Sequence, residues 1–348
     1  MAALGGNALG TAVLTQRAVA RVATGARRIE VVERPVPAVT GTDVLLDVRL
    51  CGLCGSDAHI WRGDDGYDWV TTGRVLGHEI VGVIARTGPD VPAEWAVGDR
   101  VVPIAQTGCG ACDACARDYA NGCAHKRTLG LSRDGGAAAS VVVAADALVR
   151  VPDRLPDVTA VLTEPASIAA RAVTRGRVGP GDTVVVTGPG TVGILAALAA
   201  RDAGADVVLV GTPADVRDRS APTGALGLPL RDAVPPGFVP SVWIEAAGAA
   251  AALGDAANAL PVQGRLVVVA LYGAPPSIRM NDLVRKEIEV VTSYSSFRAD
   301  YERAIESLVR HPDLGAELVR GFGFSEFADE FDAIGSGTTV KAALEPSP

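Results

Sequence analysis

Short apolar runs alternate with polar positions over the first 150 residues, and proline and glycine break them closely. The runs lie at 28–50, 79–87, 100–104 and 138–151, and they are rich in valine. Short β-branched runs between turn residues are typical of strands. The pattern therefore predicts an irregular β domain in the first part of the chain.

The pattern changes near residue 160. A helical period covers 159–173, and the apolar run 183–187 is followed by a glycine-rich turn and a helix that extends to about Ala203. Further strand candidates lie at 205–210, 241–247, 264–272 and 287–294, with an alanine-rich helix at 249–260. Strands that alternate with helices indicate a parallel, doubly wound sheet.

Two stretches depart from this alternation. Between Gly211 and Ser241, proline and glycine recur where a crossover helix should lie. Both residues destabilise helices, so we expect this helix to be short or broken. The end of the chain predicts a helix at 299–310, polar turns and a last strand at 338–344.

Composition narrows the class of protein. The 348 residues are 48% hydrophobic and 21% charged, as in an ordinary globular protein of about two domains. A net charge of −8 with no basic block argues against nucleic acid as a partner. There is no apolar run of about eighteen residues and no basic segment at the N-terminus, so we expect a cytoplasmic protein without membrane association.

Four closely spaced cysteines predict a structural zinc site. Cys109, Cys112, Cys115 and Cys123 form the pattern C-x2-C-x2-C-x7-C. Thiolates from tight turns suit the tetrahedral shell of zinc, and four protein ligands close the site. Disulfides are less favoured without a secretory signal. We expect Cys51 to be a small buried side chain.

A second group of candidate ligands begins at Cys54. The hexapeptide CGSDAH starts there, and His78 and Glu79 follow in the tripeptide GHE. A catalytic zinc takes three protein ligands and leaves one position open. Cys54 and His78 would supply two of them, and Glu79 or Glu164 would supply a carboxylate.

The sequence GPGTVG at 188–193 directly follows a predicted strand and opens a helix. In this context the glycines allow a tight turn, and the helix N-terminus receives a pyrophosphate. We therefore expect a nicotinamide dinucleotide to contact Gly188, Gly190, Thr191, Val192 and Gly193.

These three elements, in this order, resemble the zinc-dependent medium-chain alcohol and polyol dehydrogenases from about residue 17 to 346. The sorbitol and threonine dehydrogenase branch is most similar, because Glu164 stands where typical alcohol dehydrogenases carry a cysteine ligand. The resemblance implies an α/β chain with a GroES-like domain at 1–160, a Rossmann domain at 161–298 and a return to the first domain at 299–348. The active site would lie in the cleft between the domains.

The resemblance also implies roles around the catalytic metal. Ser56 would receive the proton of the substrate hydroxyl, and His59 would carry it to solvent through the cofactor ribose. Asp57 would orient His78 as a second-shell partner. Zinc would polarise the substrate oxygen while a hydride passes to the nicotinamide.

The choice between NAD and NADP is open at this stage. An NAD-preferring enzyme usually has an aspartate after the second Rossmann strand, where this chain has Gly211 followed by Thr212. Arg217 could bind a 2′-phosphate and favour NADP. Alternatively, Asp215 could fold back toward the ribose and favour NAD.

We therefore expect a dehydrogenase with one catalytic and one structural zinc. It would transfer a hydride between NAD(P) and a secondary alcohol or ketone, the alcohol being a polyol, sugar or aminocyclitol. A homodimer or homotetramer is the expected assembly. Two alternatives are a zinc-free enone or quinone reductase of the same fold, and a protein that binds zinc and nucleotide without catalysis.

Overall fold

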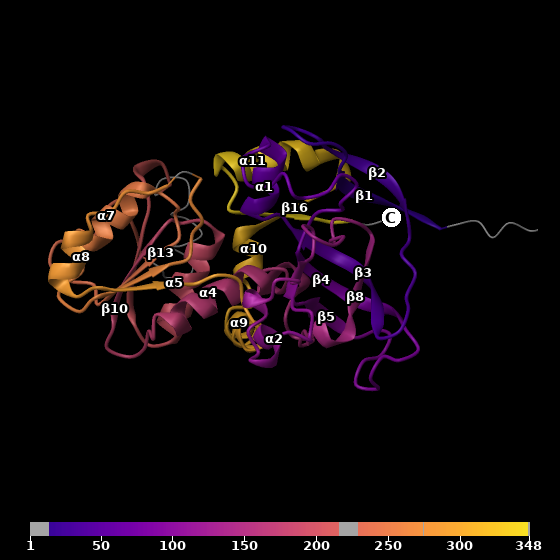
Figure 1. Cartoon of the computed structure of the whole chain (residues 1–348), viewed down its shortest axis with the longest axis horizontal. Coiled ribbons are helices and arrows are strands. Elements are labelled where there is room, and N and C mark those ends of the chain that lie inside the picture. The colour runs from indigo at the N-terminus through magenta and orange to yellow at the C-terminus, as the bar shows by residue number, and fades with distance from the viewer. Residues whose placement is uncertain (1–13, 216–228, 274, 347–348) are drawn as a thin grey trace, which may run out of the picture.

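The computed structural model describes residues 14–215, 229–273 and 275–346. These residues form two large β-sheets, with α4 (Thr163–Arg175), α9 (Arg298–Arg310) and α10 (Leu314–Leu318) lying between them (Figure 1). Among the described residues, no helix combines the length and the apolar character needed to cross a membrane.

The first domain is built on a seven-stranded sheet. Its order is β16-β17-β3-β4-β5-β9, and β8 also pairs with β3. The strands are β3 (Asp43–Gly52), β4 (Glu79–Thr87), β5 (Arg100–Pro103), β8 (Ser140–Ala144), β9 (Leu148–Arg150), β16 (Val319–Phe322) and β17 (Lys341–Leu344). Because β17 pairs with β3, the C-terminal segment completes the sheet that the N-terminal segment begins.

Smaller elements surround this sheet. Two antiparallel pairs are β1 (Thr15–Arg21) with β2 (Ile29–Pro35), and β6 (Gln106–Thr107) with β7 (Arg127–Thr128). The helical elements are α1 (Gly55–Arg62), α2 (Asp113–Ala116), α3 (Asp157–Ala160), α11 (Phe327–Ser336), η1 (Ala120–Gly122), η2 (Ala145–Ala147) and η3 (Phe324–Glu326). Trp61 on α1 packs against Phe331 on α11, which fixes the helix that carries several predicted site residues.

The second domain is a parallel sheet in the order β12-β11-β10-β13-β14-β15. Its strands are β10 (Thr183–Thr187), β11 (Asp206–Val210), β12 (Leu230–Arg231), β13 (Val242–Glu245), β14 (Arg265–Val268) and β15 (Glu289–Thr292). Its further helices are α5 (Thr191–Asp202), α7 (Ala250–Ala259) and α8 (Met280–Lys286). The chain winds outward in both directions from β10 and β13, which leaves a crevice at their carboxyl ends.

One apolar cluster joins the two domains. It contains Leu50 and Val81 from the first sheet, Val184 from β10, Ile194 from α5 and Tyr301 from α9. Each aliphatic side chain that is fully buried stabilises the fold by about 1.5–3 kcal/mol. The shared cluster therefore packs the two sheets against opposite sides of α4 and α9 (Figure 1).

The predicted α/β architecture, with a GroES-like domain and a doubly wound parallel sheet, is confirmed. The single helix expected at 159–173 is instead α3 and α4, because a proline ring at position 165 clashes with the carbonyl four residues earlier. The run at 138–151 forms two strands separated by η2. The pattern did not indicate β12, α8 or α11. The broken crossover helix falls largely on 216–228, outside the described residues, and the domain boundaries stay a prediction.

Candidate active site

Cys54 lies where the chain leaves β3 and enters α1. Its backbone is extended (φ −99°, ψ 161°), and its N–H donates to Asp57 Oδ2 at 3.0 Å. An acid in the first turn of a helix caps it in this way. The cap fixes the backbone of Cys54 at the edge of a large cleft.

Asp57 therefore differs from its expected role. Its carboxylate caps α1, and it makes no hydrogen bond to His78. Asp57 Oδ1 and His78 Nδ1 are both buried without a hydrogen-bond partner among the residues that the structure describes. Asp57 sits in the first turn of α1, so its side chain reaches back to the helix N-terminus. What it contributes to His78 is negative charge at short range.

His78 and Glu79 follow directly after a turn that only glycine can make. Gly77 has φ +87°, and a Cβ at this position would lie 2.4 Å from Cys51 Sγ. Cys51 is fully buried, as predicted. His78 and Glu79 are buried too, and with Cys54 each places one ligand atom within 4.8 Å of the others.

The charges around His78 favour a cation at this point. Burial alone would lower the pKa of His78, but Cys54, Asp57 and Glu164 raise it well above its ordinary value. Sulfur, imidazole nitrogen and carboxylate oxygen are all ligands that zinc accepts. The chemistry of the three donors and the surplus of negative groups fit a zinc ion held by Cys54, His78 and Glu79.

Lys341 is a member of this site that the sequence did not indicate. Its Nζ lies 2.7 and 2.6 Å from the two carboxylate oxygens of Glu79 and donates to the Leu53 carbonyl at 2.7 Å. Burial opposes the charge on Lys341, but Glu79 outweighs it, so the pKa of Lys341 is raised. The only signal in the sequence is that lysine is rare: the chain contains three. Lys341 holds Glu79 in place and balances its charge.

Glu164 enters the same cleft from the first turn of α4. Burial raises the pKa of Glu164 to about 7, although the nearby His78 acts in the opposite direction. Its carboxylate is not part of the group within 4.8 Å. In this structure, Glu79 is therefore the carboxylate beside Cys54 and His78, and Glu164 lies further out.

Ser56 and His59 line the cleft from α1. Ser56 Oγ is buried and has no hydrogen-bond partner within the described ranges, so its hydroxyl is available to a substrate. His59 Nδ1 lies 2.7 Å from Asp64 Oδ2, and the imidazole stacks on Tyr67 with ring centroids 5.3 Å apart. Asp64 and Tyr67 thus fix the orientation of His59, which the sequence motif alone did not show.

The glycine-rich turn between β10 and α5 has the expected form. Gly188 has φ +95°, and a Cβ there would lie 2.7 Å from the backbone of Ala247. A Cβ on Gly193 would lie 1.8 Å from the carbonyl oxygen of Gly188. Gly190 caps α5 without a side chain, which leaves N–H groups of the first turn for a phosphate. Both steric constraints match a dinucleotide-binding turn.

One cleft of about 1190 Å³ brings the metal-ligand candidates and this turn together. It is lined from the first domain by Cys54, Ser56, His59, His78 and Glu79, and from the second by Gly190, Thr191, Val192, Ala246 and Tyr272. Thr191 Oγ1 donates to the carbonyl of Val340 at 2.6 Å and so links the turn to the residue before Lys341. A substrate beside Ser56 and a cofactor on α5 would share this space.

The cysteine lobe is a separate potential metal centre. The four sulfurs of Cys109, Cys112, Cys115 and Cys123 lie within 4.8 Å of one another, and all four thiols are free. A Cβ on Gly108 would lie 2.5 Å from Cys115 Sγ, so glycine lets the loop close around the sulfurs. The disulfide alternative is not formed, and the arrangement fits a closed tetrahedral zinc site.

Comparison with known proteins agrees with this geometry. Residues 40–153 match the alcohol dehydrogenase GroES-like domain. A sorbitol dehydrogenase from Halalkalibacterium halodurans is 32% identical over 346 residues, which cover 95% of this chain and 99% of the relative. The chain belongs to the zinc-type medium-chain dehydrogenases. It is an NAD(P)-dependent alcohol dehydrogenase, so the resemblance of its motifs is confirmed.

Solved structures of other dehydrogenases carry both kinds of cofactor. An alcohol dehydrogenase from Escherichia coli CFT073 complexed with NADH has a TM-score of 0.84 and 25% identity, and the match covers 95% of this chain and 99% of that one. A zinc-binding dehydrogenase from Sinorhizobium meliloti 1021 bound to NADP has a TM-score of 0.84 and 26% identity, with 96% and 100% covered. These likenesses leave the cofactor preference of the present dehydrogenase undecided.

Glu245 is a further buried residue of the dehydrogenase that sequence reasoning missed. It ends β13, and its Oε1 accepts the N–H groups of Ala247 and Gly248 at 2.8 and 3.0 Å. Its Oε2 accepts the hydroxyl of Tyr272 at 2.5 Å. The carboxylate therefore ties the loops after β13 and β14 together at the wall of the cleft. Only tertiary pairing reveals this role.

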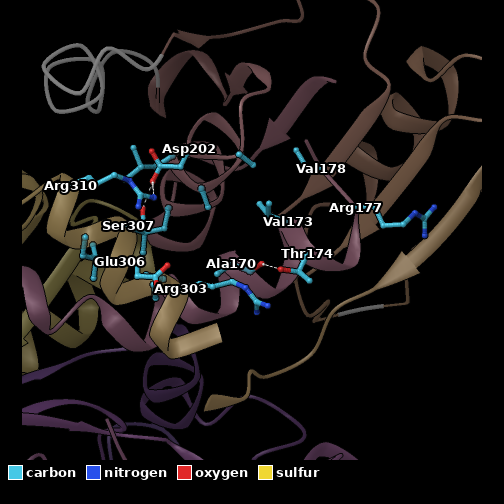
Figure 2. A pocket seen from close by; sticks show the side chains of 17 residues that line it. Ala170, Val173, Thr174, Arg177, Val178, Asp202, Arg303, Glu306, Ser307 and Arg310 are labelled. Carbon is cyan, nitrogen blue, oxygen red and sulfur yellow. Dashed lines mark hydrogen bonds and ion pairs between the residues drawn. The ribbon is translucent and has the colours of Figure 1, made fainter. Parts of the chain in front are cut away.

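A second cavity of the dehydrogenase, about 480 Å³, lies between α4, α5 and α9 (Figure 2). Its charged rim is already paired: Asp202 accepts hydrogen bonds from Ser307 and Arg310, and Arg177 pairs with Glu289 outside the cavity. None of the predicted site residues lines it. The catalytic groups therefore belong to the larger cleft.

Proposed function

We propose that the dehydrogenase is zinc-dependent and oxidises a secondary alcohol of a polyol, sugar or aminocyclitol, or reduces the corresponding ketone. The observation that carries the proposal is the cluster of Cys54, His78 and Glu79, whose ligand atoms lie within 4.8 Å of one another in the same cleft as the cofactor turn. A zinc-free reductase has no use for three buried donors at this point. Their presence favours the zinc-dependent reaction.

The residues of the chain divide the work of this reaction. When bound, zinc supplies a Lewis acid for the substrate oxygen, and the nicotinamide accepts or donates the hydride. Lys341 holds Glu79 through a buried ion pair, and Asp57 fixes the backbone of Cys54. The first turn of α5 holds the pyrophosphate. The protein thus orients both reactants and supplies charge.

The proton of the substrate hydroxyl needs a path out of the cleft. Ser56 Oγ, which has no other partner within the described residues, would accept it and pass it toward His59. Asp64 accepts a hydrogen bond from His59 Nδ1 when that nitrogen carries a proton, which leaves Nε2 as the acceptor. Ser56 is therefore the first proton carrier, and His59 the second.

Replacing Ser56 with alanine should lower turnover more than replacing His59. The Ser56→Ala variant loses the first acceptor, and general acid–base groups typically contribute about 10²- to 10⁴-fold. The His59→Ala variant should lose about 10- to 100-fold, since water can replace a carrier further from the substrate. Steady-state kcat and zinc content of both variants test this order. A His59 variant more damaged than the Ser56 variant would contradict it.

The substrate class rests on the relatives and on the cleft. The similar sorbitol dehydrogenase acts, by its name, on a polyol, and the cleft of the present chain is lined by the polar side chains of Asp64, Asp65 and Gln106. Such groups hydrogen-bond a ligand with several hydroxyl or amino groups. A hydroxylated ring or chain therefore suits the cleft better than a plain hydrocarbon alcohol.

A cofactor-reduction screen together with metal analysis tests the proposal. Purified enzyme is incubated with NAD and NADP and a panel of polyols, sugars, aminocyclitols and simple secondary alcohols, and the absorbance of reduced cofactor is followed. We expect turnover on a polyhydroxylated substrate and zinc at both metal sites. Reduction of enones or quinones alone, without zinc at Cys54, would establish the zinc-free alternative. Bound zinc and nucleotide without any turnover would establish the non-catalytic one.

We further propose a cytoplasmic homodimer or homotetramer without nucleic acid or membrane partners. β15 is an edge of the six-stranded sheet. Val290 on this strand is 48% exposed, and Met280 and Val284 on the adjoining α8 are 58% and 68% exposed. An apolar sheet edge suits pairing with a second copy of the chain. Light scattering of the purified enzyme gives the mass of the assembly.

A further inference from the structure

Position 211 cannot carry the acidic side chain that usually selects NAD. In the dinucleotide fold, an acid about 20 residues beyond the glycine-rich turn hydrogen-bonds the 2′-hydroxyl of the adenine ribose. Here that position is Gly211, at the end of β11. A Cβ on Gly211 would lie 2.6 Å from Cγ and 2.8 Å from Cδ of Pro189. The rigid proline ring of the cofactor turn therefore excludes any side chain at this point.

Asp215 lies beside the space that the missing side chain would occupy. Its Cβ would be 3.1 Å from a Cβ on Gly211. The carboxylate is folded back toward the strand end, because Asp215 Oδ2 accepts the N–H of Thr212 at 3.1 Å and the hydroxyl of Thr212 at 2.8 Å. The chain thus brings an acid to the end of β11 from four residues further on.

We infer that Asp215 selects NAD over NADP by taking the place of the excluded acid at the end of β11. It rests on the proposed function only in that the enzyme uses a nicotinamide dinucleotide, and it needs neither the zinc nor the polyol. A carboxylate has about four acceptor positions, so it can accept a ribose hydroxyl in addition to the bonds from Thr212. The 2′-phosphate of NADP would bring a second anion against it, which is unfavourable at short range.

Two other features bear on this choice. Thr212 and Asp215 also form the reciprocal hydrogen bonds of a helix cap, with Asp215 N–H 3.4 Å from Thr212 Oγ1. The cap alone would make Asp215 a stabilising residue without a role in specificity. Among the described residues, Arg231 ends the neighbouring strand β12, and its carbonyl accepts the N–H of Gly211 at 3.0 Å. Arg231 is therefore the cation to compare with Asp215 for a role in phosphate binding.

Fluorescence titration of the whole enzyme with NADH and NADPH, without alcohol substrate, tests the inference. We expect the wild type to bind NADH at least about tenfold more tightly than NADPH, the scale of one hydrogen bond to a charged group. The Asp215→Asn variant keeps an acceptor for the cap but loses the charge. Its preference for NADH should fall by about tenfold or more, chiefly through tighter binding of NADPH.

Matched variants separate specificity from stability. Asp215→Ala removes both the cap and the charge, so it should lower the melting temperature as well as the preference, whereas Asp215→Asn should change the preference at nearly the wild-type melting temperature. Arg231→Ala should leave the preference unchanged. A wild type that binds NADPH more tightly, an unaltered ratio in Asp215→Asn, or a loss of NADPH binding confined to Arg231→Ala would each overturn the inference. Failure of every alcohol substrate would not affect these measurements.

Discussion

Replacing Cys54 with alanine is expected to abolish turnover while the protein stays folded. The variant removes the sulfur from the group formed with His78 and Glu79, so zinc content should fall by about one ion per chain while the cysteine lobe keeps its own. The backbone hydrogen bond from residue 54 to Asp57 does not need the sulfur. We expect kcat/KM to fall by about a thousandfold or more, since a catalytic metal contributes several kcal/mol to transition-state stabilisation.

The matched control for this variant is Cys51→Ala. Cys51 lies three residues earlier, is fully buried and belongs to neither group of candidate ligands. Its replacement should cost some stability through lost packing but should leave zinc content and kcat near the wild-type values. NADH binding should survive in both variants, because the cofactor turn is on the other domain. Wild-type zinc content and activity in Cys54→Ala would refute the assignment of the catalytic metal.

Replacing Cys112 with serine should damage folding before it damages catalysis. Cys112 Sγ lies 3.6 Å from Cys115 Sγ in the group of four sulfurs, and a hydroxyl is a poor substitute for a thiolate ligand. Where a metal site forms only on folding, its binding energy is folding energy, of the order of 10 kcal/mol in small zinc-finger peptides. We therefore expect aggregation or a markedly lower melting temperature.

The experiment compares Cys112→Ser with Asp113→Ala, which changes the adjoining exposed residue and no sulfur. Zinc per chain, melting temperature and kcat of the soluble fraction are measured for both. A smaller rise in KM is expected for Cys112→Ser, because Asn121 in the lobe donates to the carbonyl of Tyr294, and Tyr294 lines the cleft. Unchanged stability with a selective loss of kcat would exchange the roles of the two metal sites.

Much of the fold could be predicted because its signals are local. The run Thr183–Thr187 is β10 with the same bounds, and the segments around 205–210, 241–247, 264–272 and 287–294 each contain a strand of the parallel sheet. Periodicity reports which side chains are buried, and proline or glycine reports where an element ends. β12 was missed because it is two residues long and gains its strand geometry only by pairing with β11.

The candidate site divides in the same way. The cysteine pattern and the glycine-rich turn could be identified because their members are close in sequence and local backbone geometry brings them together. The expected bond between Asp57 and His78 was not found, because the helix cap competes for the same carboxylate. Which carboxylate lies beside Cys54 and His78 also depended on the packing of α4, which sets the distance of Glu164.

The sequence by itself determined the family, the alternation of strands and helices, and the residues that carry the metal and cofactor chemistry. Only the tertiary structure joined Lys341 to Glu79 across 262 residues, tied Tyr272 to Glu245, and set the ring of Pro189 against Gly211. These contacts arise when separate strands end at the same edge or pack face to face. No local period or spacing encodes such pairs, because their distances depend on how the whole chain is packed.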